Sequence, residues 1–162
     1  MTPALTIGMD LPKRFKKVDG TYIDVVKHTI ESLKQNPHTQ IHIGTDSQNL
    51  GEITCYVTVI AYRYGTNGVH YILHKQKVPR IKDMWSRLWK ETEMTLEVAE
   101  WMKQKLPFLE LIIDMDFNDD KYWASNQLIT AAKGWAQSLG YKVNTKPVTL
   151  IACRAADYNC HS

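Results

Sequence analysis

The chain has 162 residues, 44% hydrophobic and 23% charged, with a formal net charge of +3 at pH 7. This length fits one domain that buries a core without disulfide bridges. The mild charge permits a nucleic-acid partner but excludes a strongly basic, purely electrostatic DNA binder. No apolar stretch reaches the roughly 18 to 20 residues of a membrane span, so we expect no membrane partner.

The N-terminus and the cysteines indicate a cytoplasmic protein. The segment MTPALTIGMDLPKRFKK starts apolar and continues basic, the reverse of a secretory signal. Cys55, Cys153 and Cys160 are an odd number of cysteines, typical of reduced thiols inside cells. Cys153, Cys160 and His161 fit no common zinc motif, so we expect buried thiols rather than a zinc site.

The first half of the chain predicts a helix and then three strands. Apolar residues recur at helical spacing between residues 22 and 35, at Ile23, Val26, Ile30 and Leu33. IHIGTDS (41–47) predicts a strand that ends near Asp46, and TCYVTVIAYRYG (54–65) predicts a second. The turn residues GTNGVH then lead into the return strand of a hairpin, YILHKQKVP (71–79).

The second half alternates helices with strands. Residues 84–106 contain neither Gly nor Pro and predict the longest helix, and LELIIDMDF (109–117) predicts a buried strand that ends in carboxylates. A helix over 125–140, a fifth strand over 141–152 and a short helix over 153–162 complete the chain. This order predicts a mixed α/β sheet.

Carboxylates follow both apolar strands. Asp46 lies at the end of the first, and Asp114 and Asp116 share one face of the later strand. If the two strands are parallel neighbours, these groups meet at the edge where open α/β sheets bind ligands. Clustered carboxylates repel one another unless a divalent cation binds, and oxygen ligands favour Mg²⁺ or Mn²⁺. Asp also commonly begins turns, so the residues alone leave a metal site and a structural role equally open.

Five segments resemble the ribonuclease H-like superfamily, and within it the YkuK-type family of bacterial proteins: IHIGTDSQ, RLWKETEMTLEVAEWM, IIDMDFN, AAKGWAQSLGYKVNTKP and ACRAADYNC. The resemblance implies an α/β, ribonuclease H-like domain over residues 41–162, with a five-stranded mixed sheet flanked by helices. Residues 1–40 then form an N-terminal extension with an extra helix, and the whole chain is a single domain.

The resemblance also implies four acidic residues that bind metal and act in catalysis: Asp46, Glu91, Asp114 and Asp157. Asp46 matches the aspartate of the family's first strand, and Asp114 matches that of its fourth strand. Asp157, in AADYNC, matches the acidic residue of the last helix. The roles of Asp116 and His161 stay open, although His161 is close enough in sequence to Asp157 to assist proton transfer.

Three glutamates compete for the helical position. Glu91 lies on a stripe of small and apolar residues that can face the sheet. Glu93 shares its face with Glu97 and Glu100, which is typical of a solvated stripe. We therefore choose Glu91 and keep Glu97 as the fallback.

The expected activity is hydrolysis of phosphodiesters in nucleic acid, either RNA or DNA, with two Mg²⁺ or Mn²⁺ ions roughly 3.5 to 4 Å apart. The basic segment KQKVPRIKDMWSRLWK is the expected contact surface. Ser47-Gln48 replaces the Gly-Ser of ribonuclease H and a basic handle helix is missing, so RNA:DNA hybrids are not the expected substrate. Two alternatives stay open: a nucleic-acid-binding module without turnover, and an interaction protein whose acidic rim is structural.

Overall fold

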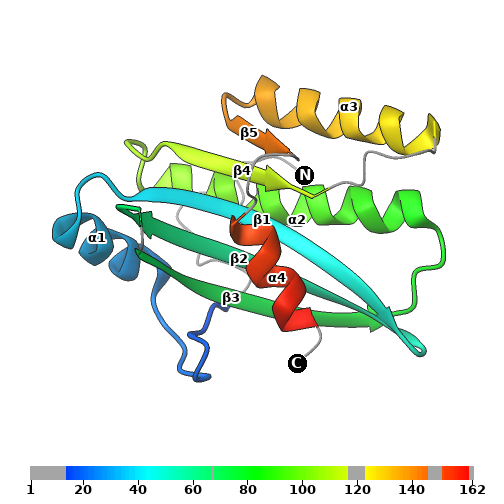
Figure 1. Ribbon diagram of the computed structural model, residues 1–162, viewed down its shortest axis with the longest axis horizontal. Helices are drawn as coiled ribbons and strands as arrows, with labels where there is room; N and C mark the ends of the chain where they lie inside the picture. Colours follow the sequence, from blue (N-terminus) through cyan, green and yellow to red (C-terminus); the bar gives the residue numbers. More distant parts are fainter. Residues whose placement is uncertain (1–13, 67, 117–122, 146–150, 161–162) are drawn as a thin grey trace.

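The computed structural model describes residues 14–66, 68–116, 123–145 and 151–160, with side chains described from residue 127 onward in the third of these segments. The elements follow one another as α1 (Val25–Gln35), β1 (Gln40–Leu50), β2 (Ile53–Tyr64), β3 (Gly68–Pro79), α2 (Met84–Lys105), β4 (Leu111–Met115), α3 (Trp123–Ser138), β5 (Lys142–Thr145) and α4 (Ile151–Cys160). This is the order that the sequence predicts (Figure 1). In the described part of the chain, no helix has both the length and the apolar character needed to cross a membrane.

The five strands form one mixed sheet in the order β3-β2-β1-β4-β5. Strand β1 lies parallel to β4, with Ile41 opposite Leu111 and Ile43 opposite Ile113. On its other side β1 pairs antiparallel with β2, which pairs in turn with β3. The prediction of a five-stranded mixed sheet is confirmed, as is the hairpin on the side of β1 away from β4.

Strand β1 is longer than predicted. It continues past Asp46 to Leu50, and Asp46 pairs with Val57 of β2. The expectation that the strand ends near Asp46 is wrong, because β2 keeps pairing with β1 as far as the tight turn at Gly51, where φ is +61°. Asp46 thus lies in a strand that β2 holds on one side, beyond the segment that pairs with β4.

The C-terminal elements also differ from the prediction. Strand β5 covers Lys142–Thr145, and residues 146–150 of the expected strand lie outside the described residues. Ile151 and Ala152, also expected in that strand, instead begin α4. A tertiary contact accounts for the early start of the helix: the backbone N–H of Ala152 donates to Asp114 Oδ2 at 3.0 Å. This carboxylate satisfies one of the N–H groups that the first turn of any helix leaves without a helical partner.

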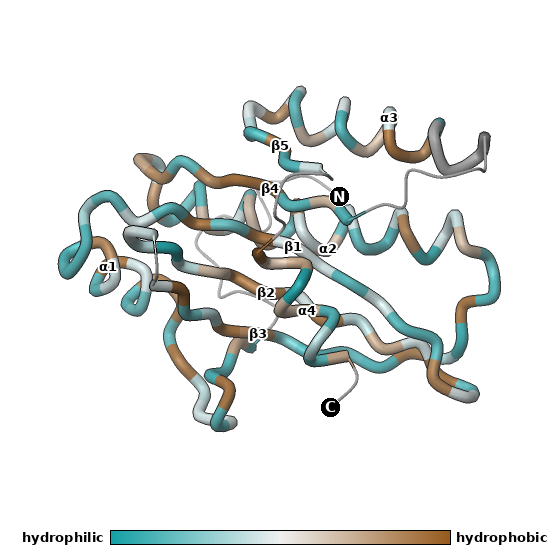
Figure 2. Tube along the Cα trace, in the orientation of Figure 1, coloured by the Kyte–Doolittle hydropathy of each residue, from teal (hydrophilic) through white to brown (hydrophobic). Residues whose placement is uncertain are grey.

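The sheet separates two hydrophobic layers, with α2 behind it and α4 in front (Figure 1). The larger core includes Ile41 and Ile43 of β1 together with residues from α1, α2 and α3. The smaller core joins β2 and β3 to α4. Strand β4 is hydrophobic along most of its length (Figure 2), as expected for a strand buried on both faces.

Helix α4 approaches β1 closely at Gly44. A Cβ atom at this position would lie 3.0 Å from Cys153 Sγ and 3.1 Å from Ala152 Cβ. The missing side chain of Gly44 therefore allows α4 to lie directly on β1, which brings the acidic residue of α4 to the strand that carries Asp46.

Candidate functional site

Asp46 and Asp157 lie side by side between β1 and α4. The pKa of Asp46 is raised to about 7, first by burial, then by a hydrogen bond with the Asp157 carboxyl group, and then by the negative charges of Asp157 and Asp116. Gln48 Nε2 also donates to Asp157 Oδ1 at 3.4 Å. The negative surroundings of Asp46 thus favour its protonated form, and a bound cation would favour the ionised form instead.

Glu91 reaches the same region from α2. Its side chain is only 4% exposed, and the Ser47 hydroxyl donates to its Oε2 atom at 2.5 Å. Burial, followed by the charge of Asp46, raises the pKa of Glu91 well above its ordinary value, while Ser47 and Arg87 act in the opposite direction. Glu93 and Glu97 lie on the exposed face of the helix. Of the three competing glutamates, the structure thus turns Glu91 toward the sheet.

Asp114 is held by protein donors. Its Oδ1 atom lies 3.1 Å from His42 Nδ1, which carries the proton in this contact, and its Oδ2 atom accepts from Ala152. The Cys153 thiol donates to the Asp114 backbone oxygen at 3.2 Å. Asp114 therefore connects β1, β4 and the first turn of α4. Sequence reasoning missed His42, although its alternation with Gly44 and Asp46 on one face of β1 was a usable signal.

Asp116 follows the last residue of β4 and lies near both Asp46 and Glu91. The parallel pairing of β1 with β4 ends at Ile43 and Ile113, and Asp46 and Asp116 each lie three residues beyond it. The negative charge of Asp116 contributes to the raised pKa of Asp46 and to that of Glu91. The sequence left the role of Asp116 open, and the structure places it next to the candidate site.

A small cavity of about 10 Å³ opens among these acidic residues. It is lined by Thr45, Glu91, Thr92, Thr95, Asp114, Met115 and Asp116. Such a volume accommodates about one water molecule, or an ion of similar size. As the described side chains lie, however, no group of three or more His, Cys, Asp or Glu residues has an arrangement that could hold a metal ion. The acidic residues share one region without forming a closed set of ligands.

A family model described as Ribonuclease H-like matches residues 22–161. The chain belongs to the ribonuclease H-like family. A comparison with curated proteins finds no match. The family match begins before α1, and α1 packs on the larger hydrophobic core through Val25 and its apolar neighbours.

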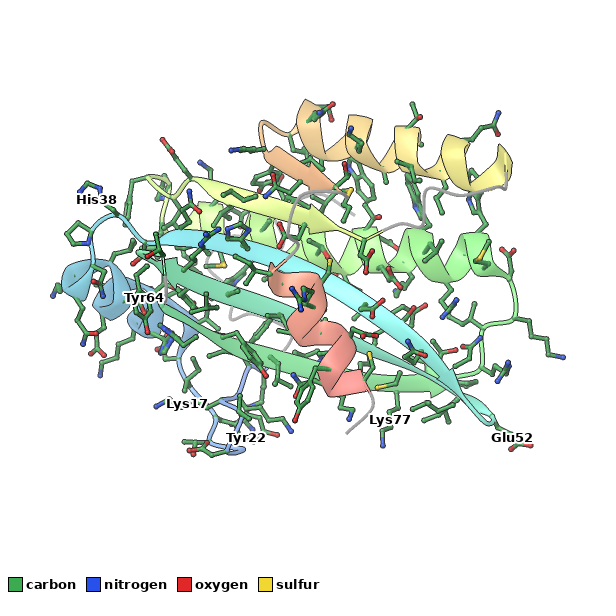
Figure 3. The ribbon with its side chains drawn as sticks, in the orientation of Figure 1. Lys17, Tyr22, His38, Glu52, Tyr64 and Lys77 are labelled. Carbon is green, nitrogen blue, oxygen red and sulfur yellow. The ribbon has the colours of Figure 1, made fainter. Side chains whose placement is uncertain are left out.

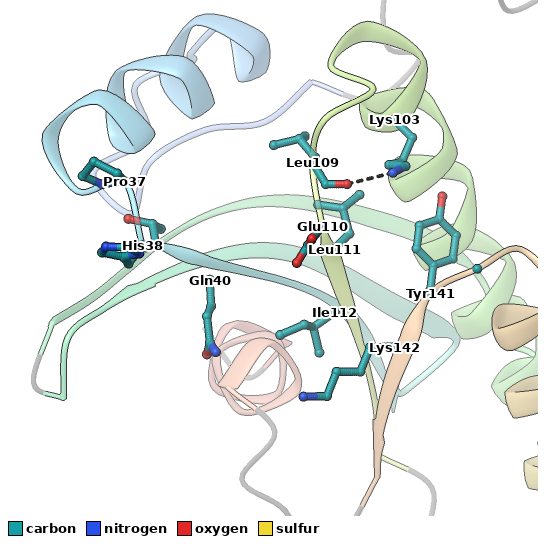
Figure 4. A pocket seen from close by; sticks show the side chains of 12 residues that line it. Pro37, His38, Gln40, Lys103, Leu109, Glu110, Leu111, Ile112, Tyr141 and Lys142 are labelled. Atoms are coloured by element: carbon teal, nitrogen blue, oxygen red, sulfur yellow. Dashed lines mark hydrogen bonds between the residues drawn. The ribbon is translucent and has the colours of Figure 1, made fainter.

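Two larger cavities of this ribonuclease H-like chain lie away from the acidic residues. One, of about 630 Å³, opens where β1, β4 and β5 begin, and Lys103 beside it donates to the Leu109 backbone oxygen (Figure 4). Glu110 is the one acidic residue among the described residues that line it. The other, of about 660 Å³, lies between α1 and β3 around His28 and His70. Neither cavity brings two carboxylates of the described segments together, so the candidate site is not the cavity with the largest volume.

The remaining predicted residues behave as follows. Cys153 and Cys160 are free, buried thiols, and burial raises the pKa of both, so they stay protonated and the expectation of buried thiols is confirmed. The nearby charges of Asp114, Asp116, Glu91 and Asp46 raise the pKa of Cys153 further, which again shows how close these groups lie. His161 lies outside the described residues.

Proposed function

We propose that this ribonuclease H-like chain is a metal-dependent nuclease that hydrolyses phosphodiester bonds with two Mg²⁺ or Mn²⁺ ions. One observation carries the proposal: acidic side chains from β1, the end of β4, α2 and α4 gather in one region, where Glu91 is buried, Asp46 is half-buried and Asp157 is exposed. Mutually repelling carboxylates in such a place are costly to the fold, and cation binding is the usual reason for their presence.

The donor chemistry of this region fits a divalent cation that prefers oxygen. The candidate ligands are all carboxylates, and the nearby Cys153 thiol is kept protonated by its raised pKa. The raised pKa values of Asp46 and Glu91 come from burial and negative neighbours, and a positive ion would counter both causes.

We assign the metal-binding role to Asp46, Glu91, Asp116 and Asp157. Asp114 was the predicted ligand from β4, and its carboxylate retains further lone pairs for a metal, but both of its oxygens already accept from His42 and α4. Asp114 then positions α4, and through it Asp157. When bound, the metal ions supply an activated water and stabilise the leaving oxygen. Ser47 keeps Glu91 in place through its short hydrogen bond.

Two finer assignments accompany this proposal. The segments IIDMDFN and ACRAADYNC support placing the chain in the YkuK-type group of the family. The substrate is a nucleic acid, and single-stranded or structured molecules suit the mild net charge better than long hybrids.

The test is cleavage of a panel of single-stranded and structured RNA and DNA oligonucleotides in Mg²⁺, Mn²⁺ or EDTA. We expect metal-dependent cleavage, lowered about 100-fold or more in Asp46→Asn and Asp116→Asn. Glu93→Gln, on the exposed face of the same helix as Glu91, is the matched control and should cleave at the wild-type rate. Binding without cleavage across the whole panel would instead establish a nucleic-acid-binding module.

A further inference from the structure

Arg87 places a positive charge beside the acidic residues. It precedes Glu91 by four residues on α2, so the two side chains project from the same face of the helix. The guanidinium is half-buried, and its charge opposes the rise in the pKa of Glu91. Arg87 thus lies about one helical turn, roughly 5 to 6 Å, from a proposed metal ligand.

The contacts of Arg87 with the protein are weak. Its Nη1 atom lies 3.4 Å from the Ser47 backbone oxygen and 3.5 Å from Ser47 Oγ. Within the segments that the structure describes, Arg87 forms no ion pair with a carboxylate. Glu91 takes its close hydrogen bond from Ser47 instead. A half-buried guanidinium therefore keeps most of its hydrogen-bonding capacity for another acceptor.

The chemistry of a guanidinium defines this acceptor. Five N–H donors in a planar fork match two oxygens of one phosphate group, and an ion pair of this kind gains strength where solvent is partly excluded. The acidic residues repel a polyanion, so a cationic contact beside the metal site is needed to hold its backbone. Arg87 meets this requirement from the first turn of α2, which points toward the same end of the molecule as Glu52 in the turn between β1 and β2 (Figure 3).

We propose that Arg87 binds a phosphate of the nucleic-acid backbone next to the metal-binding acidic residues. This inference rests on the proposed function, since it names a group that holds the substrate of that same site. In the simpler alternative, Arg87 binds no substrate and only favours the ionised form of Glu91 by lowering its pKa. The alternatives differ in one measurable respect, because a phosphate contact releases a counterion and moderation of Glu91 does not.

The experiment measures binding of a fluorescein-labelled single-stranded oligonucleotide, as DNA and as RNA, by anisotropy over a range of salt concentrations. Ca²⁺ replaces Mg²⁺ so that the probe stays intact. In Arg87→Gln we expect affinity about 5- to 20-fold weaker and a salt slope smaller by about 0.7. Arg87→Lys should restore the slope but only part of the affinity, because lysine keeps the charge without the fork.

Lys34→Gln is the matched control, since it removes the same charge from an exposed position on α1, at the opposite end of the molecule (Figure 1). It should bind within about twofold of the wild type, with the same slope. Thermal melting of every variant checks the fold.

An unchanged slope in Arg87→Gln overturns the inference, even if affinity falls, and so does a wild-type protein that binds neither probe. A wild type that binds the probes but cleaves nothing in Mg²⁺ or Mn²⁺ contradicts the proposed nuclease activity. In that case a smaller salt slope in Arg87→Gln still supports the phosphate contact of Arg87. If the wild type cleaves the substrate and Arg87→Gln binds the probes with the same affinity and salt slope as the wild type, the nuclease proposal stands and only the proposed phosphate contact of Arg87 is contradicted.

Discussion

Asp46 shows how a single residue links the fold to its proposed chemistry. Its carboxyl group is mostly buried, lies against Asp157 and has a pKa raised to about 7. In the unfolded chain the same group titrates near its ordinary value of 3.8. The folded state therefore holds a proton over a pH interval in which the unfolded state has released it, and this difference makes stability depend on pH.

The first prediction concerns this dependence without metal. The stabilising contribution of protonated Asp46 is complete below about pH 4 and is lost as the pH rises through about 7. In EDTA, the free energy of unfolding should thus fall between these values, by an amount on the order of 2 kcal/mol after screening at the partly exposed site. Thermal melts across this range should show a flatter profile for Asp46→Asn. An equally steep profile in the variant would assign the dependence to other groups.

Asp114 and Asp116 should separate by the kind of damage that each substitution causes. Asp114→Asn removes the negative charge that contacts His42 and α4. We therefore expect the free energy of unfolding to fall by about 1 to 3 kcal/mol, and amide hydrogen exchange in residues 151–160 to become faster. Asp116→Asn should leave that exchange unchanged and remove the response to metal. Hydrogen exchange and metal titration of both variants check this prediction. If Asp114→Asn instead removes the response to metal and Asp116→Asn speeds the exchange in α4, the metal ligand is Asp114.

At the scale of elements, the packing of α4 on β1 depends on Gly44. A methyl group there meets Cys153 and Ala152 at 3.0 to 3.1 Å, and a helix docked on the sheet has little freedom to withdraw. Gly44→Ala should therefore destabilise the protein by about 1 to 3 kcal/mol in denaturant unfolding.

Gly134→Ala is the control for this substitution. Gly134 lies on the exposed side of α3, and a Cβ atom there meets nothing within 4 Å. Gly134→Ala should raise the free energy of unfolding by about 0.5 to 1 kcal/mol, because alanine is the better helix former. Equal effects at the two positions would mean that α4 does not hold close to β1 in solution.

At the scale of the whole molecule, metal binding should appear as stability. A cation that binds only the folded state raises the melting temperature by mass action, so millimolar Mn²⁺ should raise it by several degrees. Asp46→Asn should abolish the rise, and Glu93→Gln should retain it because its side chain is exposed on the far face of α2. Differential scanning calorimetry with and without EDTA is the measurement. An identical rise in wild type and Asp46→Asn would place the metal elsewhere.

Local patterns in the sequence determined the kind and order of the elements. Helical spacing marked α1 and α2, and alternating or continuous apolar runs marked the strands, because these periods follow directly from backbone geometry. The same periodicity placed Glu91 on the buried side of its helix. Two apolar strands with carboxylates at their ends also indicated the edge of the sheet at which acidic residues gather.

Only the tertiary structure decided where the elements stop and which aspartate lies beside Asp46. Strand β1 runs past Asp46 because β2 continues to pair with it. Helix α4 starts earlier than predicted because Asp114 accepts a hydrogen bond from the backbone N–H of Ala152 in the first turn of this helix. Asp114 and Asp116 share one face of the chain, so alternation cannot separate them. The hydrogen bonds of Asp114 with His42 and Ala152, and the charge of Asp116 beside Asp46, do so, because both depend on residues far apart in the sequence.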